Sequence, residues 1–343
     1  MRVAVIGAGS WGTTFAALRC GNGPTVLWAR RSDLAVEVDR QHTNAAYLPG
    51  RVLPLSLRAT ASLAGAVEGA DAIAVAVPSH GFRTVLEALA PHVPAGVPVI
   101  SLAKGLEQRT RRRMTEVVAE VLPGHPAGVL TGPNLAEEIG SGQPAASVLA
   151  MDDDALAALL QPAFGTEAFR VYTSGDVVGC EVAGALKNVV AIAAGMADGM
   201  ELGDNARAAL VTRGLAELTR LAVALGGDPR TCAGLAGLGD LVATCSSAKS
   251  RNHRVGVELG RGRRLSDVVA EMRTVAEGVR TASVVCELGA DLGVEVPIAE
   301  QTDAVCRGGR PAADALAALM HRRPRRELHG FAESPPAMGT MEE

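Results

Sequence analysis

The sequence predicts an α/β protein with an N-terminal Rossmann-type domain, built on a doubly wound parallel sheet, and an all-helical C-terminal domain. Short apolar runs alternate with helical patterns in the first half, and only helical patterns follow after about Ser174. A glycine-rich segment, Gly7–Gly12, directly follows the first apolar run. Strand–helix alternation is typical of parallel sheets. A chain of 343 residues is also long enough for two cores. We therefore predict a dinucleotide-binding domain over 1–174, a substrate-binding domain over 175–320 and a flexible tail over 321–343, with an interaction arm as the alternative for the tail.

The predicted strands are continuous Val/Ile/Leu/Ala runs, as expected where helices cover both faces of a sheet. They are Arg2–Ile6, Thr25–Ala29, Ala72–Val77, Val97–Leu102, Gly128–Thr131, Ala146–Ala150 and Phe169–Tyr172. The helices predicted between them are Thr13–Cys20, Asp33–His42, Gly81–Ala90, Arg111–Leu122 and Ala155–Phe164. In the second half, helical periodicity covers Asp176–Ala197, Asp204–Leu225, Asn252–Gly260, Leu265–Met272, Gly278–Leu292, Ile298–Arg307 and Ala312–Met320.

The composition excludes several classes of protein. A formal net charge of -4 and nine aromatic residues argue against a nucleic-acid binder. The six cysteines show no Cys-x-x-Cys spacing and the seven histidines no metal-ligand spacing, so we predict no metal site. The N-terminus shows no leader pattern, and the longest apolar run that raises the question, Asn188–Ala197, is half a membrane span. We expect a cytoplasmic protein without a membrane span.

Gly7-Ala8-Gly9-Ser10-Trp11-Gly12 is a GxGxxG segment between a predicted strand and a predicted helix. In this context the first glycine makes the turn, the second lets the pyrophosphate approach the backbone, and the third packs the helix on the strand. The phosphates then lie at the helix N-terminus. We therefore predict a dinucleotide site, with a glycine-rich turn of no function as the alternative.

The second predicted strand is followed by Arg30-Arg31, where an NAD site usually has an acidic residue for the ribose 2′-hydroxyl. Two guanidinium groups suit a 2′-phosphate, so NADP is favoured and NAD admitted. The alternative is a solvated basic loop. The missing acid also argues against a methyltransferase.

Only three of the 33 basic residues are lysines: Lys104, Lys187 and Lys249. Unlike a guanidinium, an ammonium group can give up its proton. Lys104 follows a predicted strand, at the sheet edge where ligands bind in doubly wound folds. Lys187 lies in an otherwise apolar helix, where a charge is costly unless it faces a cleft. Lys187 is therefore a candidate general acid or base, with a surface lysine as the alternative.

Ser250-Arg251-Asn252 begins a predicted helix with Ser250 as its N-cap. A hydroxyl, a guanidinium, an amide and free helix N–H groups together suit a phosphate dianion. Upstream, Asp240 stands alone in a glycine-rich apolar stretch. It either orients a hydroxyl or the base, or caps a helix.

The arginine pair and the Ser250–Asn252 segment belong to a longer series of motifs that follow one another along the chain. The others are GAGSWGTT at 7–14, Lys104-Gly105, Gly132-Pro133, LKNVVAIAAGMADGMELGDNARAAL at 186–210, GLAGLGDL at 234–241 and Val275–Gly278. From residue 1 to about 320 the chain resembles bacterial NAD(P)-dependent sn-glycerol-3-phosphate dehydrogenases. The resemblance implies reduction of dihydroxyacetone phosphate to sn-glycerol 3-phosphate, which supplies phospholipid biosynthesis.

The resemblance also implies site residues. Lys187 matches the family's proton acceptor and a substrate contact. The other substrate contacts it implies are Lys104, Gly132, Asp240, Ser250, Arg251 and Asn252. The cofactor contacts it implies, beside Gly7, Gly9 and Gly12, are Ser10, Trp11, Arg30, Arg31, Lys104, Ala136, Arg251, Val275 and Glu277. Asn134 departs from the family's usual serine, and its amide keeps a donor and an acceptor for the substrate. The resemblance implies no role for Lys249.

Two other classes of function remain as alternatives. One is another two-domain reductase, of ketopantoate or 6-phosphogluconate type, although that reading leaves Ser250–Asn252 unexplained. The other is a non-catalytic NADP sensor, which would tolerate the loss of Lys187. We expect the protein to bind a small phosphorylated substrate, and a homodimer is one assembly that the sequence allows.

Overall fold

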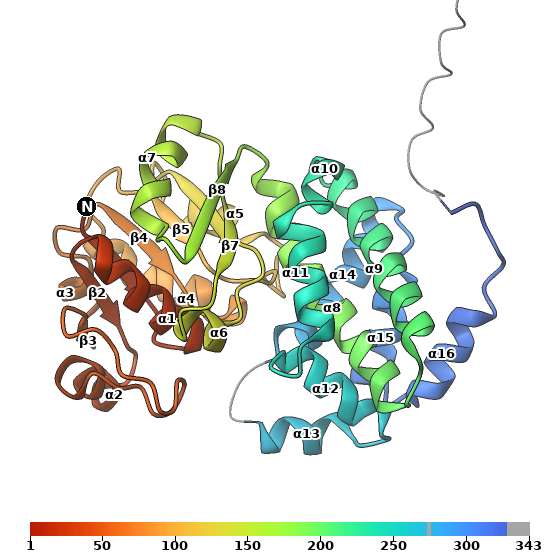
Figure 1. Cartoon of the computed structure of the whole chain (residues 1–343). Helices are drawn as coiled ribbons and strands as arrows, with labels where there is room; N and C mark the ends of the chain where they lie inside the picture. The colour runs from red at the N-terminus through yellow and green to blue at the C-terminus, as the bar shows by residue number, and fades with distance from the viewer. Residues whose placement is uncertain (273–275, 328–343) are drawn as a thin grey trace, which may run out of the picture.

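The computed structural model describes residues 1–272 and 276–327. Figure 1 shows two parts side by side, a sheet with its helices and a group of helices. We call the part that contains β1–β8, Val3 to Ser174, the sheet half, and the part that contains α8–α16, Val177 to Met320, the helical half. The predicted fold class is confirmed.

The sheet has the strand order β3-β2-β1-β4-β5-β6-β7-β8. The bounds are β1 Val3–Ile6, β2 Thr25–Trp28, β3 Arg58–Thr60, β4 Ala72–Val75, β5 Val99–Ser101, β6 Ala127–Thr131, β7 Ala145–Met151 and β8 Phe169–Ser174. The first six strands are parallel, with Val5 of β1 opposite Leu27 of β2 and Ala74 of β4. Their carboxyl ends therefore lie at one edge of the sheet, and the order reverses at β1.

The prediction of a wholly parallel sheet is wrong at one point. Strand β7 runs antiparallel to β6, with Leu130 opposite Leu149, and β8 runs parallel to β7. A parallel neighbour needs a crossover, usually a helix of some length. Only the five-residue helix α6, Ala136–Gly140, lies between β6 and β7. The absence of a predicted helix between these strands was the available signal.

The predicted helices of the sheet half are present, as α1 Ser10–Arg19, α2 Ser32–Val36 with a π-helical turn Glu37–Gln41, α4 Ser79–Leu89, α5 Met114–Val121 and α7 Asp154–Phe164. The sequence patterns missed β3, α3 (Leu63–Val67) and α6. Each has only three to five residues, too few to show a period.

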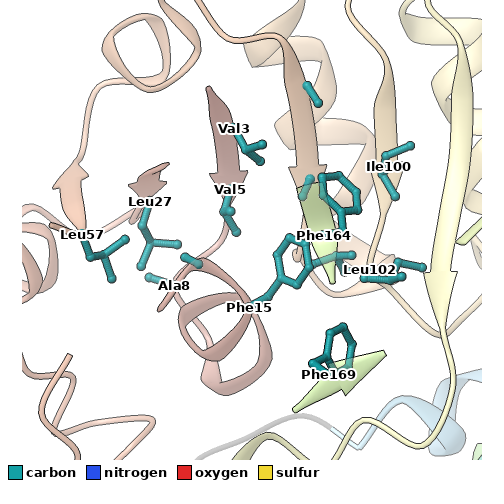
Figure 2. Close-up of a cluster of buried hydrophobic side chains, with 14 of the residues drawn as sticks. Val3, Val5, Ala8, Phe15, Leu27, Leu57, Ile100, Leu102, Phe164 and Phe169 are labelled. Carbon is teal, nitrogen blue, oxygen red and sulfur yellow. The ribbon is translucent and has the colours of Figure 1, made fainter. Parts of the chain in front are cut away.

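Apolar side chains fill both faces of the sheet. In Figure 2, Val5 of β1, Phe15 of α1 and Phe164 of α7 lie together on one face. The rings of Phe15 and Phe164 are 5.3 Å apart and perpendicular, an arrangement that aromatic pairs favour. Each such buried ring stabilises the fold by about 1.5–3 kcal/mol. Helices α3, α4 and α5 cover the other face through a second cluster that includes Phe82. Helix α1, which follows the glycine segment, is therefore firmly held.

The helical half is built around α8, Val177–Gly199. The other helices are α9 Asp204–Ala224, α10 Pro229–Cys232, α11 Asp240–Ser246, α12 Arg251–Gly260, α13 Leu265–Glu271, α14 Glu277–Leu292, α15 Pro297–Gly308 and α16 Ala312–Met320. Helix α8 has the length and composition of a membrane span, yet 94% of its apolar window is buried inside the protein. It is the central core helix of this half.

The sequence missed the short elements between α9 and α12. They are α10, a π-helical turn over Leu235–Gly239 and α11. This stretch is rich in glycine, which hides helical periodicity. The miss matters because Asp240 is the first residue of α11.

Candidate active site

The glycine segment has a different constraint at each glycine. Gly7 has φ +120°, and a Cβ there would lie 2.8 Å from the Ala76 carbonyl oxygen. A Cβ on Gly12 would overlap the Gly7 carbonyl oxygen, so the helix start packs directly on the turn. A Cβ on Gly9 would meet no atom within 4 Å. Gly9 is the N-cap of α1, with no side chain capping it. The residues present fit a pyrophosphate, since an open space faces the helix N-terminus.

Arg30 and Arg31 follow β2, whose last residue, Trp28, accepts a hydrogen bond from the Gly7 N–H at 3.0 Å. Both arginines are exposed, and Arg31 lies 3.5 Å from Asp33. The Trp11 ring packs between Phe15 and Phe169, at 5.9 and 6.0 Å. The structure thus brings two exposed cations to the same sheet edge as the glycine segment.

Two of the three lysines meet at Asp240. Lys104, after β5, donates to Asp240 Oδ2 at 2.6 Å and to the Gly132 carbonyl oxygen at 2.6 Å. Lys187 of α8 donates to Asp240 Oδ1 at 2.9 Å and to Thr244 Oγ1 at 2.6 Å. The Lys187 and Asp240 side chains are 7% and 2% exposed. Lysines that are 83 positions apart in the sequence therefore share one buried carboxylate, and we call Lys104, Lys187 and Asp240 the lysine–aspartate triad.

Burial and charge shift the proton affinities in the triad. Burial, with a contribution from the Lys187 charge, lowers the pKa of Lys104 to about 8, although Asp240 opposes the shift. Burial alone would raise the pKa of Asp240, but the charges and hydrogen bonds of the two lysines hold it below its ordinary value. With both lysines protonated the triad carries a net positive charge. It is therefore complementary to a negatively charged oxygen.

The structure tests one of the two predictions for Asp240, that it caps a helix. Helix α11 is capped by Gly239 without a side-chain bond, and the Asp240 carboxylate faces the lysines. The helix-cap alternative is wrong. One turn later on α11, Thr244 also contacts Asp240, at 3.2 Å. Sequence reasoning missed Thr244, although its i+4 spacing from Asp240 was a readable signal.

A chain of amide hydrogen bonds leads from the triad to the start of α12. Asn188 donates to the Lys104 carbonyl oxygen at 2.9 Å and accepts from Asn252 at 2.8 Å. Asn252 in turn accepts from the Gly278 N–H at 3.0 Å. The chain connects the β5 loop with α8, α12 and α14. Sequence reasoning used Asn188 only as a neighbour of Lys187 and missed its contacts.

Glycines bring α12 against α8. A Cβ on Gly195 of α8 would lie 2.9 Å from the Gly256 Cα of α12, and one on Gly199 would lie 3.0 Å from the Gly260 Cα. The two backbones are therefore in contact, and the start of α12 is held beside Lys187. The predicted N-cap is confirmed, since Ser250 Oγ accepts from the His253 N–H at 3.2 Å. Ser250 and Asn252 are buried, while Arg251 is exposed.

The segment after β6 also contacts the triad, because the Gly132 carbonyl oxygen accepts from Lys104. Gly132 has φ +147°, and a Cβ there would lie 3.0 Å from the Ser147 Cα. The Asn134 amide donates to Ser147 Oγ at 3.0 Å, and its oxygen accepts from the same hydroxyl at 3.1 Å. Asn134 is therefore held by β7, in a geometry that a serine could not reproduce. The Ala136 carbonyl oxygen accepts from Thr14 Oγ1 of α1 at 3.3 Å.

Two further contacts join the halves on either side of the triad. Glu277 of α14 accepts from the Ser79 N–H at 3.1 Å and from Ser79 Oγ at 2.5 Å, at the start of α4. Lys249 pairs with Glu138 of α6 at 2.9 Å. The third lysine therefore bridges the halves directly before Ser250.

Val275, which the family resemblance implies as a cofactor contact, lies outside the described residues. Within residues 1–272 and 276–327, no three His, Cys, Asp or Glu side chains form a group that could hold a metal ion.

Comparison with known proteins identifies the family. The model of the N-terminus of NAD-dependent glycerol-3-phosphate dehydrogenase matches residues 2–157, and that of its C-terminus matches residues 176–317. The chain belongs to the NAD-dependent glycerol-3-phosphate dehydrogenase family. A relative from Sphingopyxis alaskensis, named glycerol-3-phosphate dehydrogenase (NAD(P)+) 2, is 53% identical over 329 residues, which are 96% of this chain and 99% of the relative.

Solved structures agree. The crystal structure of glycerol-3-phosphate dehydrogenase from Coxiella burnetii has a TM-score of 0.90 and 36% identity, over 94% of this chain and 99% of that one. A ketopantoate reductase from Ralstonia eutropha has a TM-score of 0.59 at 18% identity and shares the fold alone, over 92% of this chain and all of that one. The glycerol-3-phosphate dehydrogenase family therefore accounts for the chain better than the ketopantoate alternative, and the chain is an NAD(P)-dependent oxidoreductase.

Proposed function

We propose that the protein reduces dihydroxyacetone phosphate to sn-glycerol 3-phosphate, and catalyses the reverse oxidation, at the lysine–aspartate triad. The observation that supports this most directly is the pair Lys187–Asp240 beside Lys104, buried where the sheet edge meets α8. One lysine comes from each half. A cofactor on the glycine segment and a substrate on α12 would both reach this point.

The cofactor is NAD(P)H, which supplies a hydride when bound. We propose that Gly7, Gly9, Ser10, Trp11 and Gly12 hold its pyrophosphate side, with Arg30 and Arg31 on the 2′-phosphate of NADPH. The remaining proposed contacts are Lys104, Ala136, Arg251, Val275 and Glu277. Because two exposed guanidinium groups replace the usual acid after β2, NADPH is the preferred form.

The substrate phosphate binds at the start of α12. Ser250, Arg251 and Asn252 offer a hydroxyl, a guanidinium group and an amide beside the helix N-terminus. Gly132 and Asn134 complete the wall opposite. Asn252 is already fixed through its bonds to Asn188 and Gly278, so it meets the phosphate in a set orientation.

Lys187 transfers the proton. As the carbonyl carbon of dihydroxyacetone phosphate accepts a hydride, the Lys187 ammonium group gives a proton to the carbonyl oxygen, and a hydroxyl results. Lys104 stabilises the charge that develops on that oxygen. Asp240 holds both ammonium groups in place, and Thr244 accepts a second hydrogen bond from Lys187. In the oxidation the unprotonated Lys187 takes the hydroxyl proton.

Three wider features belong to the same proposal. Residues 1–174 form the cofactor domain and 175–320 the substrate domain, and of the proposed tail, 321–343, only residues up to 327 are described. Arg322 and Arg325 in that stretch both lie 2.8 Å from Glu295. We further propose a cytoplasmic enzyme that supplies glycerol 3-phosphate for phospholipid synthesis, with a homodimer as its candidate assembly.

The test is NADPH oxidation, followed at 340 nm, with dihydroxyacetone phosphate. Lys187→Ala removes the proton donor, and Lys187→Arg keeps a cation that does not release its proton. Both are expected to lower kcat by about 10²–10⁴-fold while NADPH affinity stays within threefold. Arg230→Ala, at a basic side chain that is 90% exposed and outside the proposed site, is the control. Turnover by Lys187→Ala within tenfold of the unaltered enzyme contradicts the assignment, and no oxidation by the unaltered protein favours a sensor.

A further inference from the structure

The segment 42–57, between the π-helical turn after α2 and β3, crosses the glycine segment. Its residue Asn44 is completely buried. The Asn44 amide nitrogen donates to the Ala8 carbonyl oxygen at 3.1 Å and to Thr13 Oγ1 at 2.8 Å. The amide oxygen accepts from the Tyr47 N–H at 3.2 Å. One side chain thus holds both ends of the Gly7–Gly12 turn to its own loop.

We propose that Asn44 is a positioning residue for the cofactor, which fixes the peptide between Ala8 and Gly9 so that the Gly9 N–H faces the pyrophosphate. The inference rests on the proposed function in one respect, that the dinucleotide binds at the glycine segment. Asn44 lies outside the motifs through which the chain resembles the family.

The geometry of the peptide bond carries the first step. In a planar trans peptide the C=O and the following N–H point in opposite directions. The Ala8 carbonyl oxygen is directed into the protein, where it meets the Asn44 amide. The Gly9 N–H, at the other end of the same peptide, is therefore directed outward. This is the open side of the turn, where a Cβ on Gly9 would meet nothing within 4 Å.

The conformational freedom of glycine explains why the peptide needs a clamp. Gly7 and Gly9 flank Ala8, and glycine restricts the backbone less than any other residue. Without an outside contact the peptide between them can rotate, and its N–H then leaves the anion. A hydrogen bond to the carbonyl oxygen also polarises the peptide, which makes its N–H a better donor. Asn44 therefore both orients and strengthens this contact.

A second contact shows that the loop as a whole lies against the cofactor side. Ser10 Oγ, in the first turn of α1, donates to the Tyr47 carbonyl oxygen at 2.9 Å. The Asn44 carbonyl oxygen accepts from the N–H groups of Tyr47 and Leu48, at 3.2 and 2.8 Å. The 44–48 turn is thus internally bonded and anchored to residues 8, 10 and 13. It forms a rigid base under the pyrophosphate site.

The experiment replaces Asn44 by Asp, which keeps the size of the side chain and removes the two N–H donors. Asn22→Asp is the matched control, because Asn22 donates to the carbonyl oxygens of Pro162 and Ala163, away from the glycine segment. Calorimetry measures the Kd of NADPH and of 2′-AMP, which lacks a pyrophosphate. Steady-state kinetics give the KM of dihydroxyacetone phosphate at saturating NADPH.

Asn44→Asp is expected to raise the Kd of NADPH at least tenfold, while the Kd of 2′-AMP and the KM of dihydroxyacetone phosphate stay within twofold. Asn22→Asp leaves all three within twofold. A general loss of stability would not separate NADPH from 2′-AMP. If Asn44→Asp does not fold, Thr13→Val, which removes only the second anchor, is expected to give the same selectivity at about threefold.

Two results overturn the inference. One is an NADPH affinity within twofold of the unaltered protein, and the other is an equal loss for NADPH and 2′-AMP. Failure of the unaltered protein to bind NADPH at all would instead overturn the proposed function, and the inference with it.

Discussion

The two anion-binding regions of this molecule are built in opposite ways. The glycine segment is six consecutive residues, Gly7–Gly12, in which Gly9, the N-cap of α1, faces an open space. The lysine–aspartate triad joins Lys104 and Asp240 across 136 positions of sequence, and its groups are charged and buried. The glycine segment is made of backbone groups from neighbouring residues, whereas the triad is made of side chains from residues far apart in the sequence.

The difference predicts different sensitivities. At Gly7 and Gly12 the glycine segment tolerates no added volume, because a Cβ there would overlap neighbouring backbone atoms. The triad tolerates no change of charge, because each buried charge depends on the others. Asp240, the two glycines and Lys104 each test one of these two regions, and an exposed ion pair outside both regions gives the weakest expected effect.

The largest effect is expected for Asp240→Asn. Removing the carboxylate leaves two buried ammonium groups without a counter-charge, which costs about 3–5 kcal/mol of stability. With Lys187 no longer held, kcat is expected to fall about 10²-fold. Thermal unfolding and NADPH oxidation measure the two effects. Asp204→Asn on α9, at a side chain 95% exposed, is the control, and equal behaviour of the two variants would contradict the role of Asp240.

Two alanine substitutions distinguish the structural role of Gly12 from the cofactor-binding role of Gly9. Gly12→Ala gains about 1 kcal/mol of helix propensity, but its Cβ overlaps the Gly7 carbonyl oxygen, and overpacking costs about 1–3 kcal/mol. We expect a net loss of stability. Gly9→Ala, with free space around its Cβ, keeps the stability and lowers NADPH affinity about tenfold, because the methyl group occupies the pyrophosphate space. Denaturant unfolding and NADPH titration test this. An unchanged NADPH affinity in Gly9→Ala would contradict the placement of the cofactor.

The pH dependence tests the triad through Lys104. Its pKa is lowered from 10.5 to about 8 by burial, so it is charged below pH 8 and neutral above. In the reduction, kcat/KM for dihydroxyacetone phosphate is therefore expected to fall above pH 8, by about tenfold per unit. Lys104→Arg stays charged and removes this limb. The measurement is kcat/KM against pH for the unaltered enzyme and for Lys104→Arg. If the fall above pH 8 is the same in both, a group other than Lys104 causes it.

The smallest effect is expected at the bridge between Lys249 and Glu138. Both side chains are more than one third exposed, and such pairs contribute about 0.2–1 kcal/mol. A double-mutant cycle of Lys249→Ala and Glu138→Ala, measured on kcat/KM at low salt, is expected to give a coupling of up to about fivefold that 0.5 M salt abolishes. Additive effects at low salt would show that this bridge does not couple the halves.

Much of the fold could be predicted because its signals are local. The strand runs, the helix periods, the glycine segment and the Ser250 cap each depend on neighbouring residues, and the structure contains all of them. The predictions fail where an element is too short to show a pattern, or where its direction depends on residues far away in the sequence. Strand β3 and helices α3 and α6 have too few residues to show a period, and the reversal of β7 depends on how β6 pairs.

The candidate site divides in the same way. The sequence picked out Lys104, Lys187 and Asp240 one by one, from their rarity and their apolar surroundings. It could not show that a single carboxylate receives both ammonium groups, that Thr244 contacts the Lys187 ammonium group, or that Asn188 contacts the Lys104 backbone, since these contacts join α8, α11 and the segment after β5. It also gave Lys249 no role, whereas the structure pairs it with Glu138 of the other half.

The sequence by itself determined the alternation of strand and helix, the glycine turn at Gly7–Gly12 and the helix that Ser250 caps. Each follows from backbone preferences and side-chain periodicity over a few residues. The tertiary structure decided which charges meet, which peptide Asn44 holds and which lysine joins the halves. These depend on the packing of distant elements, such as the glycine contact of α8 with α12, and that packing has no local signature in the chain.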